Sequence, residues 1–321
     1  MPTMKEIADE TGLSIATVSR ALQSNGKVSE KTRQKVLLSM QKLSHQDEGV
    51  FFKGNIGLIL ADAENPFYHS IIRIIDRELR AEGYCLLCTI TNDRASSAAY
   101  LRQLCQQGVR GIVWLNPNLV SCGTVLDELK GANIPLVQVG ANIEPTLDSV
   151  AFDDELGVYT IARALFRQYC HKRILFIGPH DTKHFQGYVE ACKEADLPIF
   201  LDGDIPVPNA KNQAQQICQA IEHSQPTAII THTEYNTVET LRACQILKKR
   251  IPEDMSIIAY DDYPWMSMME ISAICHPLEE LGKGVCRLLV KRIERSSKEQ
   301  PPLHLMVTPH LILRESVCAN R

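Results

Sequence analysis

The sequence lacks an apolar run long enough to span a bilayer, and no secretory signal precedes its first predicted helix. It also lacks a basic excess, because its formal net charge is −4 at pH 7. Aromatic residues are scarce at 6%, whereas the 45% of hydrophobic residues is ordinary for a soluble globular chain. We therefore expect a cytoplasmic protein with no membrane partner.

Motifs for metal binding, cofactor binding and catalysis are missing as well. Of the eleven cysteines, Cys85 and Cys88 form a C-x-x-C pair, but they fall in an expected strand and would face opposite sides. There is no G-x-S-x-G, no G-x-x-x-x-G-K-[ST] and no G-x-G-x-x-G that opens a helix. The carboxylate pairs Asp153-Asp154 and Asp261-Asp262 could suggest a glycosidase, but adjacent side chains at strand ends point apart. We expect reduced thiols, no metal, no cofactor and no catalytic residue.

What is present begins with a helical segment over residues 1–44. Thr3 and Glu6 have the spacing of a capping box, Gly12 marks a tight turn, and Ser14 and Ser29 are placed to cap two further helices. Two short helices joined by a Gly-containing turn are typical of a helix-turn-helix, whose second helix enters the DNA major groove. In the third helix the sequence predicts four inward residues, which are Val36, Leu37, Met40 and Leu43.

Charge is segregated along the chain. Residues 1–43 contain seven basic and four acidic residues, a net charge of +3, so the remainder carries about −7. A basic N-terminal segment followed by an acidic remainder is consistent with a protein that contacts DNA phosphates only through its N-terminal segment.

Beyond a linker at residues 45–55, apolar strand patterns alternate with helical ones. Strands are expected at 56–61, 84–90, 111–114, 135–139, 149–152, 173–177, 228–231 and 256–259. Helices are expected at 68–82, 96–107, 155–169, 187–195, 212–223, 237–248 and 279–294. This alternation predicts two parallel sheets with helices on both faces, and a ligand at the carboxyl ends of the strands.

Short motifs along the whole chain carry a resemblance. Ala8-x-x-x-Gly12-x-Ser14 followed by Thr17-Val18-Ser19-Arg20 resembles the headpiece of the lactose-repressor/galactose-repressor family of bacterial transcription regulators. Further landmarks of that family match at 65–68, 107–113, 171–174, 251–254, 257–262 and 313–316.

The resemblance implies an α/β protein in which a three-helix helix-turn-helix headpiece (1–44) precedes a shortened linker (45–55) and a periplasmic-binding-protein-like effector domain (56–321). That domain would have two lobes with two doubly wound parallel sheets, an N-lobe of about 56–152 plus 277–305 and a C-lobe of about 153–276 plus 306–321. Three crossovers are expected, near Phe152, His276 and Pro309.

The resemblance also implies which residues touch DNA. Ile15, Ala16 and Arg20 occupy the positions that read base edges, and an arginine can bond guanine in bidentate fashion. Ile15 and Ala16 could instead simply pack inside the headpiece. The remaining contacts, to phosphate, are expected from Thr3, Ser14, Thr17 and Ser19.

For the effector, the family pattern is kept at Phe67, Tyr68 and Asp261, while Asp262 is expected to be a structural partner. Elsewhere it departs, because His184 replaces an arginine, Thr233-Glu234 replaces an Asn-Asp pair, and His276 replaces a late glutamine. Each histidine could be an ordinary surface or core residue. As a set, the changes indicate a retained fold with altered ligand chemistry.

The linker departs too. The segment SHQDEGVFFKGN has no Pro, no Ala-Arg pair and no leucine, the features with which the family's hinge helix bends operator DNA. We expect little DNA bending, with Phe51 and Phe52 either covering the start of the effector domain or serving as a substitute wedge.

These features together favour a DNA-binding transcriptional regulator of carbohydrate metabolism, a homodimeric repressor that binds operator DNA and a sugar-like effector. A solute-binding protein for transport is one alternative, but it should carry a secretory signal and lack residues 4–43. An α/β enzyme is the other, and it should show clustered catalytic groups.

Overall fold

The computed structural model describes residues 3–22, 28–44, 52–60, 66–90, 97–115, 123–140, 144–205, 212–295 and 301–320. The chain divides into two compact units. Unit 1 comprises Met1–Val150 and Leu278–Leu305, and unit 2 comprises Ala151–Pro277 and Met306–Arg321. The chain thus changes unit next to Val150, Pro277 and Leu305, and the third change precedes Pro309, near which it was expected.

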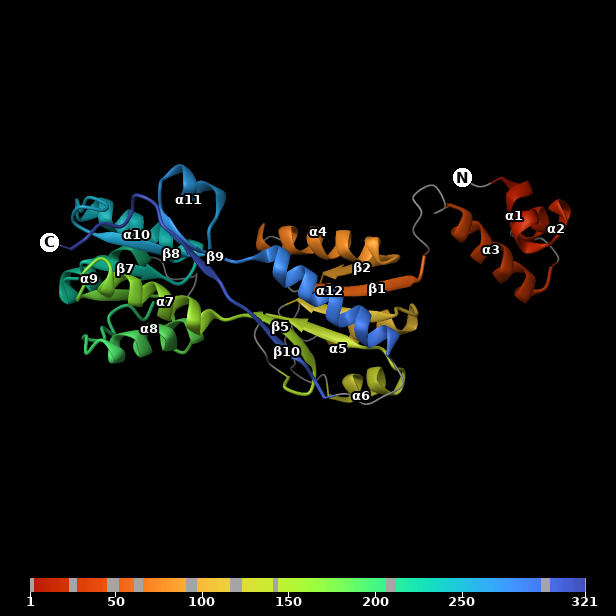
Figure 1. Cartoon of the computed structure of the whole chain (residues 1–321), viewed down its shortest axis with the longest axis horizontal. Helices are drawn as coiled ribbons and strands as arrows, with labels where there is room; N and C mark the ends of the chain where they lie inside the picture. The colour runs from red at the N-terminus through yellow and green to blue at the C-terminus, as the bar shows by residue number, and fades with distance from the viewer. Residues whose placement is uncertain are drawn as a thin grey trace. The chain divides into compact units, whose positions relative to one another are not determined.

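Three helices form the headpiece, α1 (Met4–Thr11), α2 (Ile15–Leu22) and α3 (Glu30–Ser44) (Figure 1). The predicted capping box is confirmed, because the Thr3 backbone N–H donates to Glu6 Oε2 at 2.6 Å and the Glu6 N–H donates to Thr3 Oγ1 at 3.3 Å. Gly12 ends α1 in the left-handed conformation at φ 66°, which glycine adopts without strain. Ser14 Oγ accepts from the Thr17 N–H at 3.2 Å, so it caps α2 as predicted.

The headpiece core consists of Ile7, Ala8, Val18, Ala21 and Val36. The inward position predicted for Leu37 is wrong, since its side chain is 43% exposed. Successive helical residues differ by 100° in direction, so a helix that buries Val36 turns its neighbour away from the same core. Met40 packs partly against the core, and the side chain of Leu43 lies outside the described residues.

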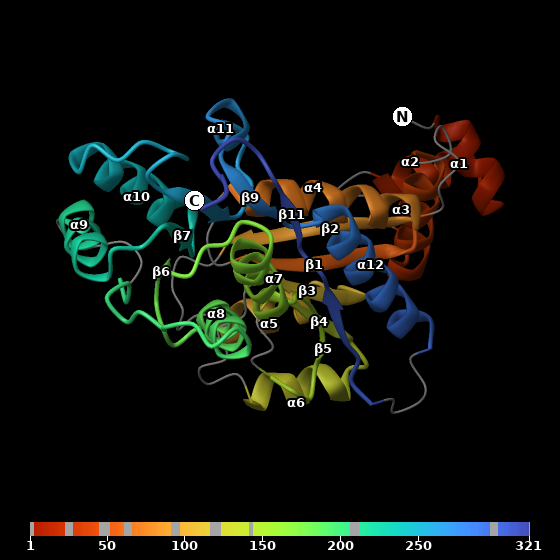
Figure 2. The same ribbon diagram turned by 60° about the vertical axis from the view of Figure 1, so that its left-hand side comes forward.

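Unit 1 contains a six-stranded sheet in the order β10-β5-β4-β3-β1-β2. The pairs β1–β2, β1–β3, β3–β4 and β4–β5 are parallel, as predicted. Helices α4 and α12 lie side by side on one face, and α5 and α6 cover the other (Figures 1 and 2). The strands are β1 (Gly54–Leu60), β2 (Tyr84–Ile90), β3 (Gly111–Leu115), β4 (Leu136–Val139), β5 (Asp148–Phe152) and β10 (His304–Val307). The helices are α4 (Pro66–Ala81), α5 (Ser97–Gln106), α6 (Gly123–Gly131) and α12 (Leu278–Glu294).

Two differences from the prediction concern the edges of this unit. Strand β1 starts at Gly54, so the last two residues assigned to the linker belong to the sheet, whereas Phe51 and most of the linker lie outside the described residues. The unpredicted strand β10 is tied to the unit by Asp148, which accepts two hydrogen bonds at 2.7 Å from Arg292 of α12 and one at 2.8 Å from the Leu303 N–H.

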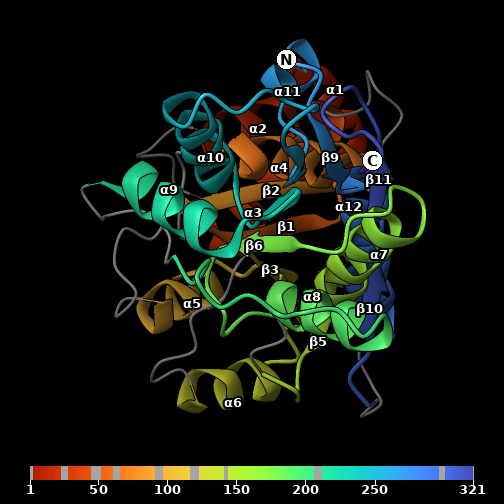
Figure 3. The same cartoon turned by 90° about the vertical axis from the view of Figure 1, so that its left-hand side faces the viewer.

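Unit 2 contains a five-stranded sheet in the order β11-β9-β8-β7-β6. Its strands are parallel except for the edge strand β11, which runs antiparallel to β9. Helices α7 and α8 pack on one face, and α9 and α10 pack on the other (Figure 3). The strands are β6 (Ile174–Ile177), β7 (Ala228–Thr231), β8 (Ser256–Tyr260), β9 (Ser272–Cys275) and β11 (His310–Ile312). The helices are α7 (Asp154–Arg167), α8 (Lys183–Glu194), α9 (Gln213–Ser224), α10 (Glu234–Ile246) and α11 (Pro264–Met268).

Two helices of unit 2 begin three or four residues earlier than predicted. Helix α8 starts at Lys183 rather than Gly187, and α10 starts at Glu234 rather than Thr237. The reason is capping, because Thr182 Oγ1 accepts from the Phe185 N–H at 3.3 Å and Thr233 Oγ1 accepts from the Asn236 N–H at 3.2 Å.

The cysteines in the described parts of the chain are all free thiols, as expected, and four of them are buried. In β2, Cys85 is half-buried and Cys88 is exposed. Among the described helices, none combines the length and the apolar composition needed to cross a membrane.

Candidate functional site

Helix α2 presents the residues predicted to read DNA. Ile15 is 50% exposed, and Ala16 and Arg20 are also exposed, so the alternative that Ile15 and Ala16 pack inside the headpiece does not hold. The Arg20 Nε donates to the Ala16 carbonyl oxygen at 3.1 Å, which lays the guanidinium along the helix. At the start of α2, the hydroxyl groups of Ser14 and Thr17 are hydrogen-bonded to each other at 2.9 Å. The remaining predicted contacts are an exposed Thr3 at the start of α1 and a half-buried Ser19.

A second group of candidate site residues, three of them predicted, lies in unit 2, where the strands of its parallel sheet end. His232 follows β7, Tyr260 ends β8 and Asp261 follows it, and His276 follows β9. The carboxyl ends of parallel strands meet at one edge of a sheet, which is where ligands bind in open α/β sheets. Two helix starts complete this group, which we call the carboxyl-edge cluster: Asp154 of α7, His184 of α8, His232, Tyr260, Asp261 and His276.

His276 is the central residue of this cluster. Its Nδ1 lies 2.8 Å from Asp261 Oδ1, and its Nε2 lies 3.8 Å from Asp154 Oδ1, while only 9% of the side chain is exposed. The Tyr260 hydroxyl donates to the same Asp154 oxygen at 2.7 Å. Asp261 has φ 76°, a backbone conformation that is uncommon in residues other than glycine and is best tolerated by Asn and Asp.

The histidines of the cluster are in two different protonation states. Burial lowers the pKa of His276, but its contacts with Asp154 and Asp261 outweigh burial and raise that pKa to about 9. Burial raises the pKa of Asp154, yet His276, His184 and Tyr260 bring it below its usual value. Burial lowers the pKa of His184, and it lowers the pKa of His232 to about 4. At neutral pH the cluster therefore holds one imidazolium and two neutral imidazoles.

The rings of the cluster pack against one another and leave two ring nitrogens buried without a hydrogen-bond partner among the described residues. His184 meets His232 edge-on, with ring centroids 4.4 Å apart, and meets Tyr260 edge-on at 4.3 Å. Phe152 lies against His276 at 4.2 Å. Within the described residues, Nδ1 of His232 and Nε2 of His276 are buried and have no hydrogen-bond partner. Unpaired ring nitrogens beside carboxylates are suited to hydroxyl groups of a ligand, which can donate and accept.

The structure brings together three of the predicted effector residues, Asp261, His184 and His276, and places the others differently. Thr233 is the N-cap of α10. Its hydroxyl oxygen accepts from the Asn236 N–H, and its hydroxyl group donates to Asn236 Oδ1. Phe67 and Tyr68 belong to the first turn of α4 in unit 1; Tyr68 is half-buried, and the side chain of Phe67 lies outside the described residues.

Three members of the cluster were not predicted as site residues: Asp154, His232 and Tyr260. The sequence signal that could have found His232 is its position directly after a buried strand, and Tyr260 is the last residue of one. Asp154 follows the point where the chain enters unit 2, next to the start of a helix.

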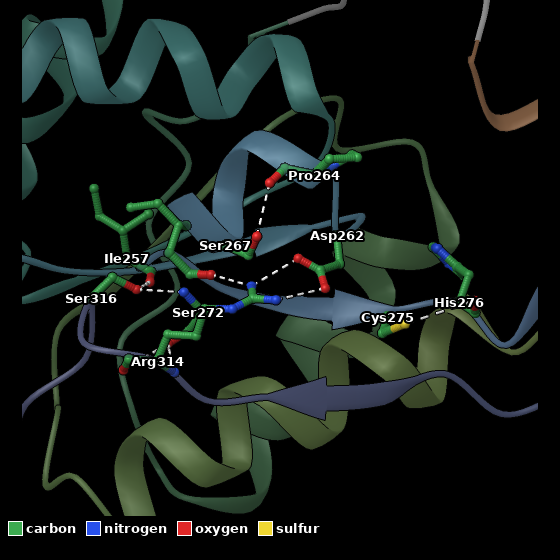
Figure 4. A network of polar contacts seen from close by, with 10 residues as sticks. Ile257, Asp262, Pro264, Ser267, Ser272, Cys275, His276, Arg314 and Ser316 are labelled. Atoms are coloured by element: carbon green, nitrogen blue, oxygen red, sulfur yellow. Dashed lines mark hydrogen bonds and ion pairs between the residues drawn. The ribbon is translucent and has the colours of Figure 1, made fainter. Parts of the chain in front are cut away.

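Asp262, the neighbour of Asp261, is a structural residue, as expected. Both of its carboxylate oxygens accept from the Arg314 guanidinium at 2.8 Å (Figure 4). The same guanidinium donates to the Ile271 carbonyl oxygen at 2.6 Å, and the Arg314 N–H donates to Ser272 Oγ at 2.8 Å. Ser316 continues this network to β8 through the Ile257 carbonyl oxygen at 2.6 Å. In the described parts of the chain no group of three or more His, Cys, Asp and Glu side chains could hold a metal ion.

Comparison with known proteins gives matches along the whole chain. Residues 3–46 match the family model described as bacterial regulatory proteins, lacI family, and residues 150–317 match the periplasmic binding protein-like domain. The ribose operon repressor of Bacillus subtilis is 28% identical over 323 residues, covering 96% of this chain and 97% of the relative. The HTH-type transcriptional repressor PurR of Yersinia pestis is 28% identical over 342 residues, covering 99% and 97%.

Solved structures agree on the fold. A complex of the transcriptional regulator CelR with cellobiose has a TM-score of 0.68 at 23% identity, covering 98% of this chain and 100% of that one. A lacI-family regulatory protein from Chloroflexus aggregans has a TM-score of 0.70 at 25% identity, covering 82% and 98%. The chain therefore belongs to the lacI family of bacterial regulatory proteins, DNA-binding transcriptional regulators with a periplasmic-binding-protein-like domain for a small-molecule effector.

Proposed function

We propose that this chain represses transcription by inserting α2 into the major groove of operator DNA, and that an uncharged, sugar-like effector controls this binding. The observation that carries the proposal is the exposed α2 face of Ile15, Ala16 and Arg20, none of which belongs to the headpiece core. Arg20 would read guanine, and the two apolar side chains would contact thymine methyl groups. Phosphate would be held by Thr3, Ser14, Thr17 and Ser19.

The effector site of this proposal is the carboxyl-edge cluster of unit 2. Asp261 would accept from ligand hydroxyl groups, and His184 and His276 would line the same edge. Phe67, Tyr68 and Thr233 remain part of the proposal through the family resemblance. Sugars occupy several structural neighbours of similar fold: the CelR complex contains cellobiose, and a lacI-family regulator of Enterococcus faecium contains ribose.

We also propose that the regulator acts as a homodimer. Four exposed apolar side chains lie on, or directly after, two neighbouring helices of unit 2, α10 and α11, which are linked by a hydrogen bond of 2.6 Å between Trp265 and Glu234. These are Tyr235 (40% exposed), Val238 (46%), Met268 (85%) and Met269 (59%). A second copy could cover this surface symmetrically, and two headpieces would then read two half-sites.

Selection of bound fragments from a genomic DNA library with the full chain tests this function. The proposal predicts enrichment of a near-palindromic sequence, and a change of its affinity by one of a panel of neutral sugars. A ligand that changes DNA affinity does so through a coupling free energy of about 1–3 kcal/mol. Recovery of fragments without a common sequence would contradict the proposal.

A further inference from the structure

His276 joins three separate elements of unit 2 at the proposed ligand edge. Its ring, which follows β9, lies between Asp261 after β8 and Asp154 at the start of α7, at 2.8 Å and 3.8 Å. Nine-tenths of the side chain is buried, and its Nε2 makes no hydrogen bond within the described residues. The ring is thus a fixed polar group of the site, not a surface side chain.

Negatively charged groups outnumber positively charged ones around the His276 ring. Asp154 faces it from the start of α7, and Asp261 faces it from the residue after β8. His184 of α8 lies 3.8 Å from Asp154 Oδ1, to which the Tyr260 hydroxyl donates. Among the described residues, two basic side chains next to members of the cluster have other partners: Lys183 pairs with Glu155 at 2.9 Å, and Arg314 pairs with Asp262 at 2.8 Å. Burial keeps His184 and His232 neutral by lowering the pKa of each.

We propose that His276 is the specificity-determining residue of the carboxyl-edge cluster: as an imidazolium between Asp154 and Asp261 it cancels one of the two carboxylate charges, so the site admits uncharged ligands in preference to cationic ones, while the remaining carboxylate charge excludes phosphorylated ligands. The cluster then carries one net negative charge, which repels a phosphate. Without the imidazolium the net charge becomes −2, and a ligand with an ammonium group is attracted. This inference rests on the proposed function, because it assigns the ligand class of the proposed effector site.

The first experiment measures the protonation of His276 and needs no ligand. The histidine ring resonances of the full chain are followed by NMR between pH 5 and pH 10, with His276→Gln used for assignment. We expect the His276 resonance to titrate above about pH 8, and in Asp261→Asn to titrate lower. Titration of His276 below about pH 7 in the wild type would overturn the proposal, whether or not the protein binds DNA.

The second experiment measures specificity by thermal shift and calorimetry with two matched sugar pairs, D-ribose with D-ribose 5-phosphate and D-glucose with D-glucosamine. The wild type should respond to neutral sugars and not to the phosphate. His276→Gln should improve the affinity for glucosamine relative to glucose by about tenfold, the scale of one unit charge at close range. His223→Gln is the control, because its ring pairs with Asp202 at 2.7 Å on the surface of unit 2.

Binding of the phosphorylated sugar to the wild type would overturn the proposal. So would equal responses of wild type and His276→Gln to glucose and glucosamine, the absence of any response included. Failure of the proposed function has a different signature, namely that the full chain selects no operator sequence while His276 still titrates above about pH 8.

Discussion

Asp262 and Arg314 form a bidentate ion pair, in which each carboxylate oxygen lies 2.8 Å from a guanidinium nitrogen. The preceding residue, Asp261, turns the other way and contacts His276 instead. Two adjacent carboxylates therefore have separate partners, one within the structural network of β8, β9 and the returning chain and one at the proposed ligand edge. This difference allows stability and effector response to be separated by single substitutions.

Replacement of Asp262 should affect stability. In Asp262→Asn the largely buried guanidinium of Arg314 loses its counter-ion, so we expect the free energy of unfolding to fall by about 3 kcal/mol. Urea unfolding measures this change. Asp254→Asn is the control, because it breaks the exposed ion pair with Arg250 and should change stability little. A small effect of Asp262→Asn would show that the network does not depend on this ion pair.

Replacement of Asp261 should affect regulation. Asp261→Asn removes the negative charge and one of the two acceptor oxygens that we propose for ligand hydroxyl groups, so the variant should bind operator with wild-type affinity and respond at least about tenfold more weakly to the effector. Fluorescence anisotropy of labelled operator, with and without the sugar identified by screening, measures both quantities. Asp202→Asn, on the surface of unit 2, should behave as the wild type. A normal effector response in Asp261→Asn would remove this residue from the site.

The exposed methionines at the end of α11 should govern assembly. Met268→Asp combined with Met269→Asp places two charges on the proposed dimer surface, so the dimer dissociation constant should rise by at least about tenfold. Sedimentation velocity at micromolar concentration should show a wild-type dimer and a monomeric variant. Leu201→Asp is the control, since it adds a charge at another exposed apolar side chain of unit 2. A wild-type tetramer or monomer would contradict the account.

The histidines should give stability a maximum near neutral pH. The pKa of His276 is raised from 6.5 to about 9, so its contribution is complete below about pH 6.5 and is lost as the pH rises to about 9. The pKa of His232 is lowered to about 4, so its contribution is complete above about pH 6.5 and is lost as the pH falls toward 4. Each effect should be about 1–3 kcal/mol in thermal unfolding. In His276→Gln the alkaline loss should shrink while the acid loss stays; unchanged profiles would contradict this assignment.

Buried strands were the most predictable part of the fold. Segments such as Ala228–Thr231 are short apolar runs bounded by turn residues, and their observed bounds equal the predicted ones. The starts of α8 and α10 were less predictable, because their polar first turns have no apolar period and only the capping residues Thr182 and Thr233 mark them. The elements β9, β11 and α11 were not predicted, because each is too short to show an apolar periodicity.

The site was partly predictable. Family resemblance pointed to Asp261, His184 and His276, which the fold brings together. It did not point to Asp154, whose distance from His276 depends on how α7 packs against a sheet whose last strands come more than a hundred residues later. No local sequence pattern predicts the contact between Asp154 and His276. The raised pKa of His276 follows from the same tertiary arrangement.

The central claim is that α2 reads a specific DNA sequence, and comparison of operator with scrambled DNA tests it most directly. Equilibrium binding of both duplexes is measured for the wild type, Arg20→Ala and Arg20→Lys at one salt concentration. Because a bidentate guanine contact needs the guanidinium fork, both variants should lose about 1–3 kcal/mol on the operator and much less on scrambled DNA. Equal losses on the two duplexes, or a wild type that does not distinguish them, would contradict the account.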